Sequence, residues 1–235
     1  MSAREGLSLR QAEKKARRAR LEAELGARQK ALPTKKYGGV LGDPPWRFEP
    51  WSRITGMDRA AENHYPTASL AAIKALDVAG IAAADCVLFL WATAPMLPHA
   101  IEVMEAWGFT YKTCAVWAKD RIGTGYWLRN RHELLLIGTR GNPPAPAPGT
   151  QWPSLIQAPV REHSRKPDEV YALIESYFPT LPKIELFARH ARPGWDRWGS
   201  EAGSPDLAAR PATEATADTL ARAREPDHPR AGSAP

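Results

Sequence analysis

Apolar positions between residues 37 and 200 alternate between short continuous runs and helical spacing. The helical spacing predicts helices over Ser69–Val78, over 101–107 with Gly108 as the cap, and over Pro167–Phe178. The continuous runs are typical of strands, and they lie at Tyr37–Gly42, Cys86–Trp91, Tyr111–Trp117, Leu134–Gly138 and Lys183–Phe187. This alternation predicts an α/β fold built on a mostly parallel sheet. Ligands of such sheets bind at the carboxyl ends of the strands, so the loops that follow strands are the places to search for chemistry.

The chain divides into three regions by composition. Residues 1–36 carry 11 Lys or Arg and 4 Asp or Glu, and we expect a basic arm that is helical or partly disordered. Residues 37–200 contain all nine tryptophans, so the folded domain is expected there. Residues 201–235 contain no aromatic residue and are predicted to be a disordered tail. The formal net charge of +6 therefore comes from the arm and not from the domain.

Composition excludes several classes of function. No stretch approaches the roughly 18 consecutive apolar residues that a membrane helix needs, and no secretory signal is visible. The two cysteines, Cys86 and Cys114, cannot form a disulfide framework, which favours a reducing, cytoplasmic location. His163 and His190 show no ligand spacing, so no metal site is predicted. The glycine fingerprint of nicotinamide enzymes is absent, which argues against hydride transfer.

The loop after the first predicted strand, Asp43-Pro44-Pro45-Trp46, has an unusual composition for a turn. A carboxylate and a proline carbonyl held by rigid backbone offer two acceptors, which suits the two N–H donors of an exocyclic amine. Trp46 offers a face for packing against a planar base. Accepting both hydrogens returns the nitrogen lone pair for attack on an electrophilic methyl group, which needs orientation rather than a strong base. The bare tetrapeptide fits equally well a stiff turn with a core tryptophan.

Several further blocks follow this loop in a fixed order. Together with 42–46 they resemble the family of the eukaryotic mRNA N6-adenosine methyltransferase catalytic subunit and its bacterial and phage relatives, which modify adenine in nucleic acid. The resemblance covers about residues 38–201. The blocks are His64-Tyr65-Pro66-Thr67, Leu88-Phe89-Leu90-Trp91, Trp107-Gly108-Phe109, Trp117-Ala118-Lys119, Thr124-Gly125-Tyr126-Trp127-Leu128 with Glu133, Gly141-Asn142-Pro143, 164–169, 183–189 and 195–199.

The resemblance implies a doubly wound Rossmann-like methyltransferase sheet in which the acceptor loop precedes the cofactor strand, a permuted order. It also implies a role for each matching residue. Asp43, Pro44, Pro45 and Trp46 would be catalytic, with Tyr65 and Glu133 on the substrate side. The residues expected to bind S-adenosylmethionine are Lys166, Glu185, Phe187, Arg189, His190, Ser200 and Glu201. Ser200 stands where the family usually has Asn, and no acid ahead of Asp43 matches the upstream cofactor-binding aspartate of the eukaryotic members.

Structural explanations compete with three of these roles. Lys166 precedes Pro167, Asp168 and Glu169, a common helix start, although a lysine is unfavourable at that end of a helix. Glu185 lies in an apolar strand, so it must be paired or face a ligand, and a salt bridge to Arg189 is the structural alternative. Glu133 is a possible partner of Arg131.

We therefore expect methyl transfer from S-adenosylmethionine to the N6 amine of adenine in nucleic acid. DNA is favoured over RNA because neither zinc-finger spacing nor an RRM-like aromatic signature is present. Two alternatives stay open at this point. One is a catalytically silent nucleic-acid-binding homologue, and the other is methylation of cytosine N4 or a protein glutamine. A homodimer or a partner subunit is possible, and no membrane partner is expected.

Overall fold

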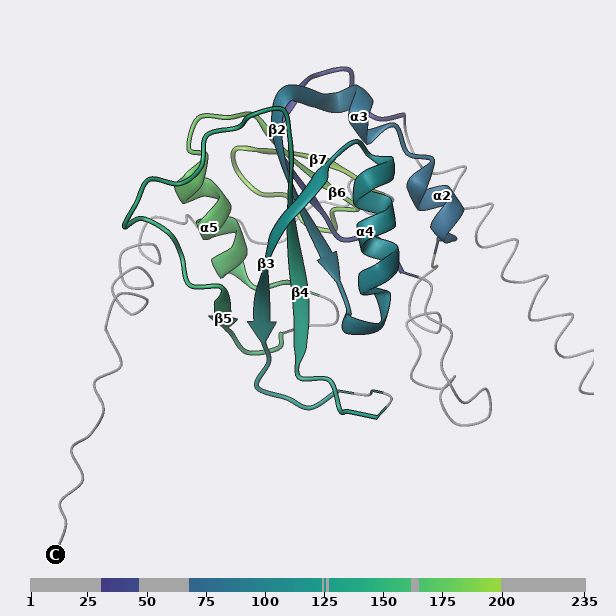
Figure 1. Cartoon of the computed structure of the whole chain (residues 1–235), viewed down its shortest axis with the longest axis vertical. Helices are drawn as coiled ribbons and strands as arrows, with labels where there is room; N and C mark the ends of the chain where they lie inside the picture. The colour runs from purple at the N-terminus through teal and green to yellow at the C-terminus, as the bar shows by residue number, and fades with distance from the viewer. Residues whose placement is uncertain (1–30, 47–67, 124, 126, 162–164, 200–235) are drawn as a thin grey trace, which may run out of the picture.

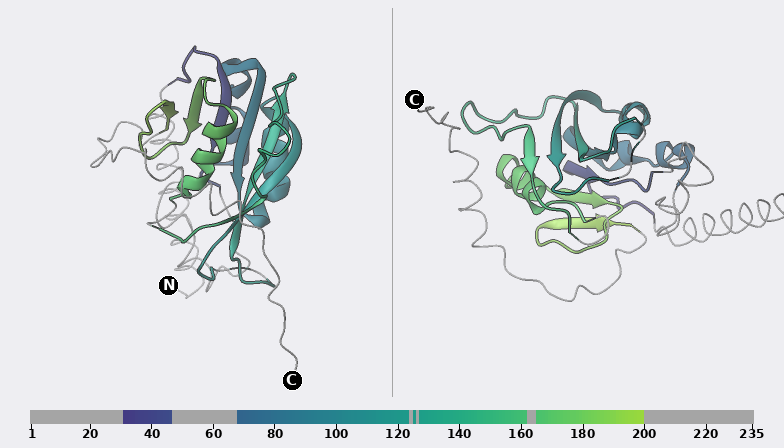
Figure 2. Two further views of the ribbon diagram at one scale, coloured as in Figure 1. Left: turned by 90° about the vertical axis from the view of Figure 1, so that its left-hand side faces the viewer. Right: turned by 90° about the horizontal axis from the view of Figure 1, so that it is seen from below.

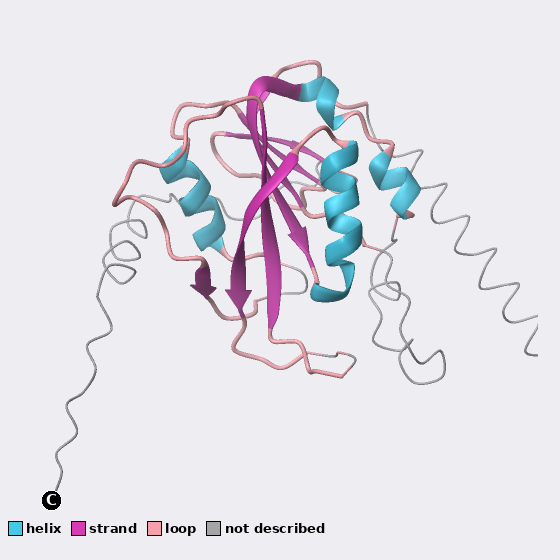
Figure 3. Ribbon diagram, in the orientation of Figure 1, coloured by secondary structure: helices cyan, strands magenta, loops and turns pink. Residues whose placement is uncertain are grey.

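A computed structural model of the chain describes residues 31–46, 68–123, 125, 127–161 and 165–199. Strands and helices are interspersed along this part of the chain (Figures 1 and 3). The elements are β1 (Tyr37–Gly42), α2 (Leu70–Lys74), α3 (Val78–Ile81), β2 (Ala82–Ala92), the 3₁₀ turn η3 (Ala94–Met96), α4 (Leu97–Ala106), β3 (Thr110–Ala118), β4 (His132–Arg140), β5 (Leu155–Gln157), α5 (Asp168–Tyr177), β6 (Lys183–Leu186) and β7 (Trp195–Trp198).

One seven-stranded sheet has the order β5-β3-β4-β2-β1-β6-β7. Every neighbouring pair is parallel except the two that involve β4, which runs antiparallel to both β2 and β3. The prediction of a mostly parallel sheet is therefore confirmed. β1 lies between β2 and β6 in the sheet. Although β6 follows β1 by about 140 residues in the sequence, the two strands pair, with Val40 opposite Ile184. The acceptor strand thus precedes the strand with the KIEL sequence, as the permuted order requires.

The structure differs from the sequence prediction at its shortest helices and strands. The single helix predicted over Ser69–Val78 is wrong: α2 ends at Lys74, and α3 starts anew after Asp77. The Asp77 side chain accepts a hydrogen bond from the Gly80 backbone N–H (2.8 Å) and caps α3, so the chain leaves the helical path there. The strands β5 and β7, of three and four residues, were not predicted because such short segments carry too little periodicity to identify.

Helices cover both faces of the sheet, which confirms the doubly wound architecture. Alternate residues of the central strands point into two separate apolar clusters. Val40 and Leu88 pack with α2, α3 and α4 on one face, whereas Leu41 and Phe89 pack with α5 on the other. Figure 2 shows α5 and α4 on opposite sides of the strands. No helix in the described ranges is long and apolar enough to cross a membrane.

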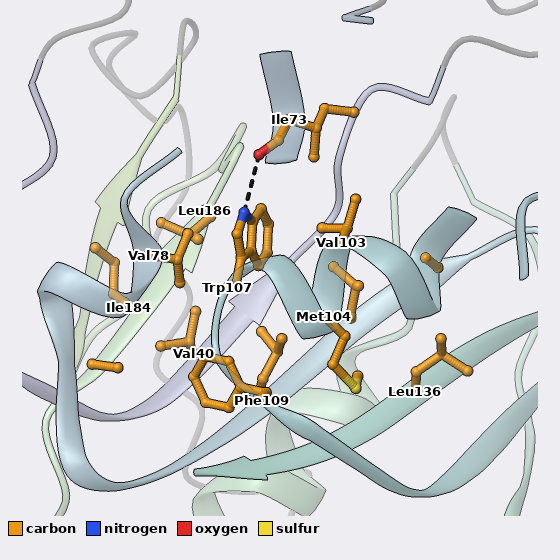
Figure 4. Packing of buried hydrophobic residues seen from close by; sticks show 14 of the residues in the cluster. Val40, Ile73, Val78, Val103, Met104, Trp107, Phe109, Leu136, Ile184 and Leu186 are labelled. Atoms are coloured by element: carbon orange, nitrogen blue, oxygen red, sulfur yellow. Dashed lines mark hydrogen bonds between the residues drawn. The ribbon is translucent and has the colours of Figure 1, made fainter. Parts of the chain in front are cut away.

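Trp107 anchors the cluster beneath α4. Its side chain is fully buried, and its indole N–H donates to the carbonyl of Ile73 (3.0 Å), which fixes α2 against α4 (Figure 4). Gly108 follows in the left-handed conformation (φ 81°), so the predicted glycine cap of this helix is confirmed. The chain can then turn directly into β3.

The order of the central strands predicts where a ligand crevice lies. From β1 the chain proceeds to β2 on one side, and only later to β6 on the other side. The carboxyl ends of β1 and β6 therefore flank the point where the winding direction changes, which is where doubly wound sheets bind ligands. Asp43 follows β1 at this point, and Phe187 follows β6.

Candidate active site

Asp43 is fixed at the carboxyl edge by the backbone around it. Its N–H donates to the carbonyl of Leu186 (3.4 Å), which extends the β1–β6 pairing by one residue. In the following loop the N–H of Trp46 donates to the carbonyl of Pro44 (2.7 Å), and the N–H of Ala68 donates to that of Pro45 (3.0 Å). The Pro44 carbonyl thus already accepts one internal hydrogen bond, and its second lone pair is the acceptor capacity left for an amine.

Trp46 lies in the apolar core. Its side chain is 9% exposed, and its indole N–H donates to the carbonyl of Trp91 (2.9 Å). The tryptophan therefore fastens the loop to the end of β2, as expected for a stiff turn with a core tryptophan. Its role as a wall of the base pocket stays a prediction.

Lys166 joins two carboxylates that are far apart in the sequence. Its Nζ lies 3.1 Å from Oδ2 of Asp43 and 3.0 Å from Oε2 of Glu133. All three side chains are largely buried, with exposed fractions of 11% for Lys166, 21% for Asp43 and 15% for Glu133. This arrangement explains why a lysine stands at the unfavourable end of α5: its ammonium group faces carboxylates at the sheet edge.

Glu133 has a second cationic partner. Its Oε1 lies 2.5 Å from Nζ of Lys119, which follows β3. Arg131, the partner suggested by the sequence, instead donates from its guanidinium group to the carbonyl of Lys119 (3.1 and 3.3 Å). The four side chains of Lys119, Glu133, Lys166 and Asp43 form one line of alternating charge, which we call the charge chain.

Burial and neighbouring charges set the ionisation of these groups. Burial raises the pKa of Asp43 above its ordinary value, Glu133 adds to the rise, and the Lys166 ammonium opposes it. Burial would also raise the pKa of Glu133, but Lys166 and Lys119 hold it below its ordinary value. Although burial disfavours the ammonium form of Lys166, the charges of Asp43 and Glu133 keep its pKa above the ordinary value. Lys166 is therefore a permanent cation beside Asp43.

Aromatic rings line the charge chain. The Lys166 ammonium lies 5.4 Å from the centre of the Trp91 ring, and that of Lys119 lies 4.6 Å from the Trp117 ring. The two rings meet edge to face with centres 6.1 Å apart. The Trp91 Nε1 is buried and has no hydrogen-bond partner among the residues that the structure describes. An apolar, aromatic surround strengthens the electrostatic coupling of the charges beside it.

Glu185 lies on the neighbouring strand β6. The hydroxyl of Tyr171, on α5, donates to its Oε1 (3.0 Å). Burial raises the pKa of Glu185 to about 7, with the charge of Asp43 adding to the rise, while the hydrogen bond from Tyr171 and the charges of Arg192 and Lys166 oppose it. One described hydrogen bond leaves most of the acceptor capacity of the carboxylate for a ligand.

The connection after β6 is short and tied to α5. Only residues 187–194 join the parallel strands β6 and β7, where a crossover helix would be usual. The guanidinium of Arg192 donates twice to the carboxylate of Glu175 (2.6 and 2.9 Å), and the indole N–H of Trp195 donates to it as well (2.8 Å). Arg192 also stacks over the Tyr171 ring at 4.6 Å. This clamp holds the predicted cofactor loop close to Glu185.

Other predicted site residues fall into two groups. Phe187 adopts the left-handed conformation (φ 62°) and meets Trp198 edge to face, so the chain turns sharply at the end of β6. Arg189 is partly buried, and its charge is near enough to oppose the rise in the pKa of Asp43, while His190 is exposed. Tyr65, Ser200 and Glu201 lie outside the described residues.

The site also contains residues for which no role was predicted from the sequence. Lys119, Trp91 and Tyr171 contact the predicted residues directly. Lys119 stood inside a family block, but nothing in its neighbours indicates that it meets Glu133 across the β3–β4 loop. Tyr171 lies inside the helix predicted over Pro167–Phe178, but helical spacing cannot show that a hydroxyl at that position reaches a carboxylate on β6.

The crevice suits a cofactor with a polar, hydroxyl-bearing end. Glu185 supplies a carboxylate with acceptor capacity, Phe187 turns the backbone beside it, and the Lys166 and Asp43 pair lies at the adjoining strand end. Of these residues, Glu185, Phe187 and Lys166 would hold S-adenosylmethionine, which supplies an electrophilic methyl group when bound. No group of three or more His, Cys, Asp or Glu in the described ranges could hold a metal ion.

Fold and site together define a Rossmann-like methyltransferase with its acceptor loop ahead of its cofactor strand. Comparison with known proteins agrees: the MT-A70 family matches residues 37–201. The chain belongs to the MT-A70 family and is an S-adenosylmethionine-dependent adenine-N6 methyltransferase, so the expected family, enzyme class and methyl donor are confirmed.

Individual relatives differ in how much of them the chain spans. It is 37% identical over 185 residues to the Type II methyltransferase M.MunI of Mycoplasma sp, a match that covers 72% of this chain and 79% of that protein. It is 34% identical to the N(6)-adenosine-methyltransferase MT-A70-like protein of Arabidopsis thaliana and 32% identical to the N(6)-adenosine-methyltransferase catalytic subunit METTL3 of Homo sapiens. These matches cover 70% and 74% of this chain but only 24% and 30% of the two relatives.

Proposed function

We propose that this protein methylates the N6 amine of adenine in DNA, with Asp43 as the acceptor that orients the amine. The observation that carries the proposal is the buried Asp43 carboxylate at the strand crevice, held 3.1 Å from the Lys166 ammonium. An ionised carboxylate in this position accepts an amine N–H, and the permanent cation beside it favours the ionised form against the effect of burial.

The chemistry asks little more of the protein than orientation. One amine N–H would donate to Asp43 and the other to the remaining lone pair of the Pro44 carbonyl, which draws the nitrogen towards a tetrahedral geometry. Bound S-adenosylmethionine would supply the electrophilic methyl group, Asp43 and Pro44 would hold the amine nitrogen in line with it, and the proton that the methylated nitrogen loses would pass to water. Fixed acceptors stabilise the developing positive charge on nitrogen without reorganisation.

Similarity favours DNA as the polymer. The relatives named N(6)-adenosine-methyltransferases carry a ribonucleoside in their names, and they share 32–34% identity with less than a third of their length matched. M.MunI, a Type II methyltransferase, shares 37% identity over 79% of its length. The match to M.MunI covers a much larger share of the relative than the other two matches do. This difference supports a substrate like that of M.MunI.

The β3–β4 loop supports contact with a single strand or a flipped base. It extends from the carboxyl edge at the foot of Figure 1 and presents Trp127 and Leu128, whose exposed fractions are 89% and 78%. The exposed arginines Arg129 and Arg131 lie beside them in the sequence. Exposed aromatic and basic side chains together are typical of surfaces that stack bases and track phosphates. Because extruding a paired adenine costs a few kcal/mol, we expect faster reaction on unpaired DNA.

The test is to incubate the wild-type protein with S-adenosylmethionine labelled in the methyl group and one sequence presented as single-stranded DNA, duplex DNA and RNA. Mass spectrometry of the nucleosides should show labelled N6-methyldeoxyadenosine, formed fastest from single-stranded DNA. RNA methylated more than tenfold faster than both DNA forms would overturn the choice of DNA. Label in N4-methylcytosine, or in a glutamine of an added protein extract, would replace adenine with the alternative acceptor.

A further inference from the structure

Lys119 takes part in the charge chain without reaching the proposed acceptor. Its Nζ lies 2.5 Å from Oε1 of Glu133 and 4.6 Å from the centre of the Trp117 ring, and its side chain is 20% exposed. No direct contact between Lys119 and Asp43 is present in the described residues. Amine orientation by Asp43 does not in itself require this lysine, so its burial against a carboxylate calls for a separate explanation.

The two oxygens of Glu133 are divided between two cations. Oε1 faces Lys119 and Oε2 faces Lys166 at 3.0 Å, while Lys166 also reaches Asp43 at 3.1 Å. The charge chain thus contains two cations and two anions, with none more than about a fifth exposed. In a poorly solvated cluster each pairing depends on its neighbours, because water cannot replace a lost partner.

The backbone of Lys119 is held as firmly as its side chain. Its N–H donates to the carbonyl of Arg131 (2.8 Å), and its own carbonyl accepts from the Arg131 guanidinium. These bonds close the base of the β3–β4 loop. The ammonium group of Lys119 is therefore presented to Glu133 from a fixed position and not from a loosely placed surface side chain.

Loss of Lys119 would change what Lys166 does. Glu133 would then have Lys166 as its one remaining cationic partner in the charge chain, and the attraction between these two side chains would increase. Lys166 would be drawn towards Glu133 and away from Asp43, which lies on its other side. Asp43 would lose part of the positive charge that offsets its burial.

We infer that Lys119 is a positioning residue for methyl transfer: by holding one oxygen of Glu133, it leaves Lys166 shared between Glu133 and Asp43. The inference rests on the proposed role of Asp43 as amine acceptor. Lys119 acts through Glu133 and Lys166 and touches neither substrate nor methyl donor. Its removal should therefore alter the protonation of Asp43 rather than abolish the reaction.

The charged groups around Asp43 determine in which direction its pKa should move when Lys119 is removed. Besides Lys166 and Glu133, the charge of Arg189 acts on Asp43, and Asp43 in turn acts on Glu185 and Tyr171. Of these, Lys166 is the cation closest to Asp43 for which a contact is described. A weaker Lys166 contact raises the pKa of Asp43, and a protonated carboxyl has less acceptor capacity for an amine. The acid limb of the rate profile should therefore move to higher pH.

The experiment measures kcat/KM against pH on single-stranded DNA for the full-length wild type, Lys119→Met and Lys119→Arg. The methionine variant keeps the packing on Trp117, and its acid limb should lie about one pH unit higher, which is a tenfold lower rate on that limb. The arginine variant restores the charge and should return the limb to its wild-type position. Lys112→Met is the matched control, since Lys112 is an exposed lysine of β3, and its profile should equal that of the wild type.

A second measurement separates positioning from folding. Thermal unfolding of Lys119→Met verifies that the variant is folded, so that a shift of its acid limb reports the positioning of Lys166 and not a loss of structure. If the methionine variant does not fold, Lys119→Gln, which keeps a donor for Glu133 without the charge, should show the shift in the same direction. An acid limb that stays in place in a folded variant would overturn the inference, whereas a wild type that methylates no adenine would instead contradict the proposed function.

Discussion

Two buried lysines at opposite edges of the sheet show how different two polar sites in one core can be. Lys183 starts β6 at the amino edge, and its side chain ends on backbone carbonyls: it donates to Phe178 (2.7 Å) and Leu181 (2.9 Å). Lys166 lies at the carboxyl edge and ends on the carboxylates of Asp43 and Glu133. Lys183 links the end of α5 to the start of β6, whereas Lys166 links the start of α5 to the end of β1 and the start of β4.

The pKa values of the two lysines move in opposite directions. Burial lowers the pKa of Lys183, and the charge of Glu175 opposes this effect without reversing it. Burial would also lower the pKa of Lys166, but the carboxylates of Asp43 and Glu133 raise it above its ordinary value. A lysine bonded to carbonyls at the amino edge is consistent with a structural role, and a lysine held between two buried carboxylates at the carboxyl edge is consistent with the proposed reactive site.

The largest effect is expected when the acceptor at the carboxyl edge is removed. Asp43→Ala deletes one of two amine acceptors, so kcat/KM should fall by about 2–4 kcal/mol of transition-state stabilisation, by analogy with single donors of oxyanion holes. Binding of S-adenosylhomocysteine, followed by calorimetry, should stay close to that of the wild type. Turnover within tenfold of wild type would remove Asp43 from the reaction.

Removing Lys166 tests the comparison directly. Lys166→Met leaves Asp43 and Glu133 as two buried carboxylates near one another, so the pKa of Asp43 should rise further. We expect activity at pH 7 to fall about tenfold or more and to recover partly as the pH is raised, which a pH series of initial rates would show.

Lys183→Met is the matched control at the other edge. It removes two hydrogen bonds to buried carbonyls, so the free energy of unfolding should fall by about 1–2 kcal/mol, while kcat/KM and its pH profile should not change. Denaturant unfolding of both lysine variants gives the comparison. Equal losses of activity in the two variants would mean that the amino and carboxyl edges do not differ in the way described above.

Glu185 lies two residues after Lys183 on β6, and it carries a smaller but pH-dependent effect. Because its pKa is raised from the ordinary 4.5 to about 7, the folded protein keeps a proton that the unfolded chain releases in this range. Stability from this group therefore falls as the pH rises from about 4.5 to about 7 and is constant above that. Glu185→Gln should lack this decline in unfolding measurements without ligand.

The same residue is predicted to bind the methyl donor. Calorimetric titration of S-adenosylhomocysteine into a folded Glu185→Ala variant should show at least about tenfold weaker affinity, because the carboxylate acceptor is lost. Unchanged affinity would make Glu185 a structural residue that pairs with Tyr171.

The smallest effect is expected from the basic arm, which lies largely outside the described residues. Its 11 Lys or Arg should bind phosphates without sequence preference, so deleting residues 2–34 should reduce the slope of log affinity for DNA against log salt concentration. The value of kcat on saturating DNA should not change, because the deletion removes no member of the charge chain. An unchanged slope would exclude direct phosphate binding by the arm.

The sequence by itself determined the long elements and the family. Continuous apolar runs identify the central strands because both faces of these strands are buried, as at Cys86–Trp91, where every residue is buried. The order of the motif blocks identified the methyltransferase class and the permuted order, since motifs in a fixed sequence are far more specific than any single one. Short elements such as α3 and β7 escaped because they carry little periodicity.

Only the tertiary structure decided which charges meet. Asp43, Lys119, Glu133 and Lys166 lie on four segments separated by up to 123 residues, and the sequence assigned three of them to separate roles and gave Lys119 none. The pairing arises because the ends of β1 and β3, the start of the antiparallel β4 and the start of α5 all lie at one edge of the sheet. Strand order and register place each charged group within about 3 Å of the next one in the charge chain. No pattern local to the chain encodes strand order, since that depends on which apolar faces pack together.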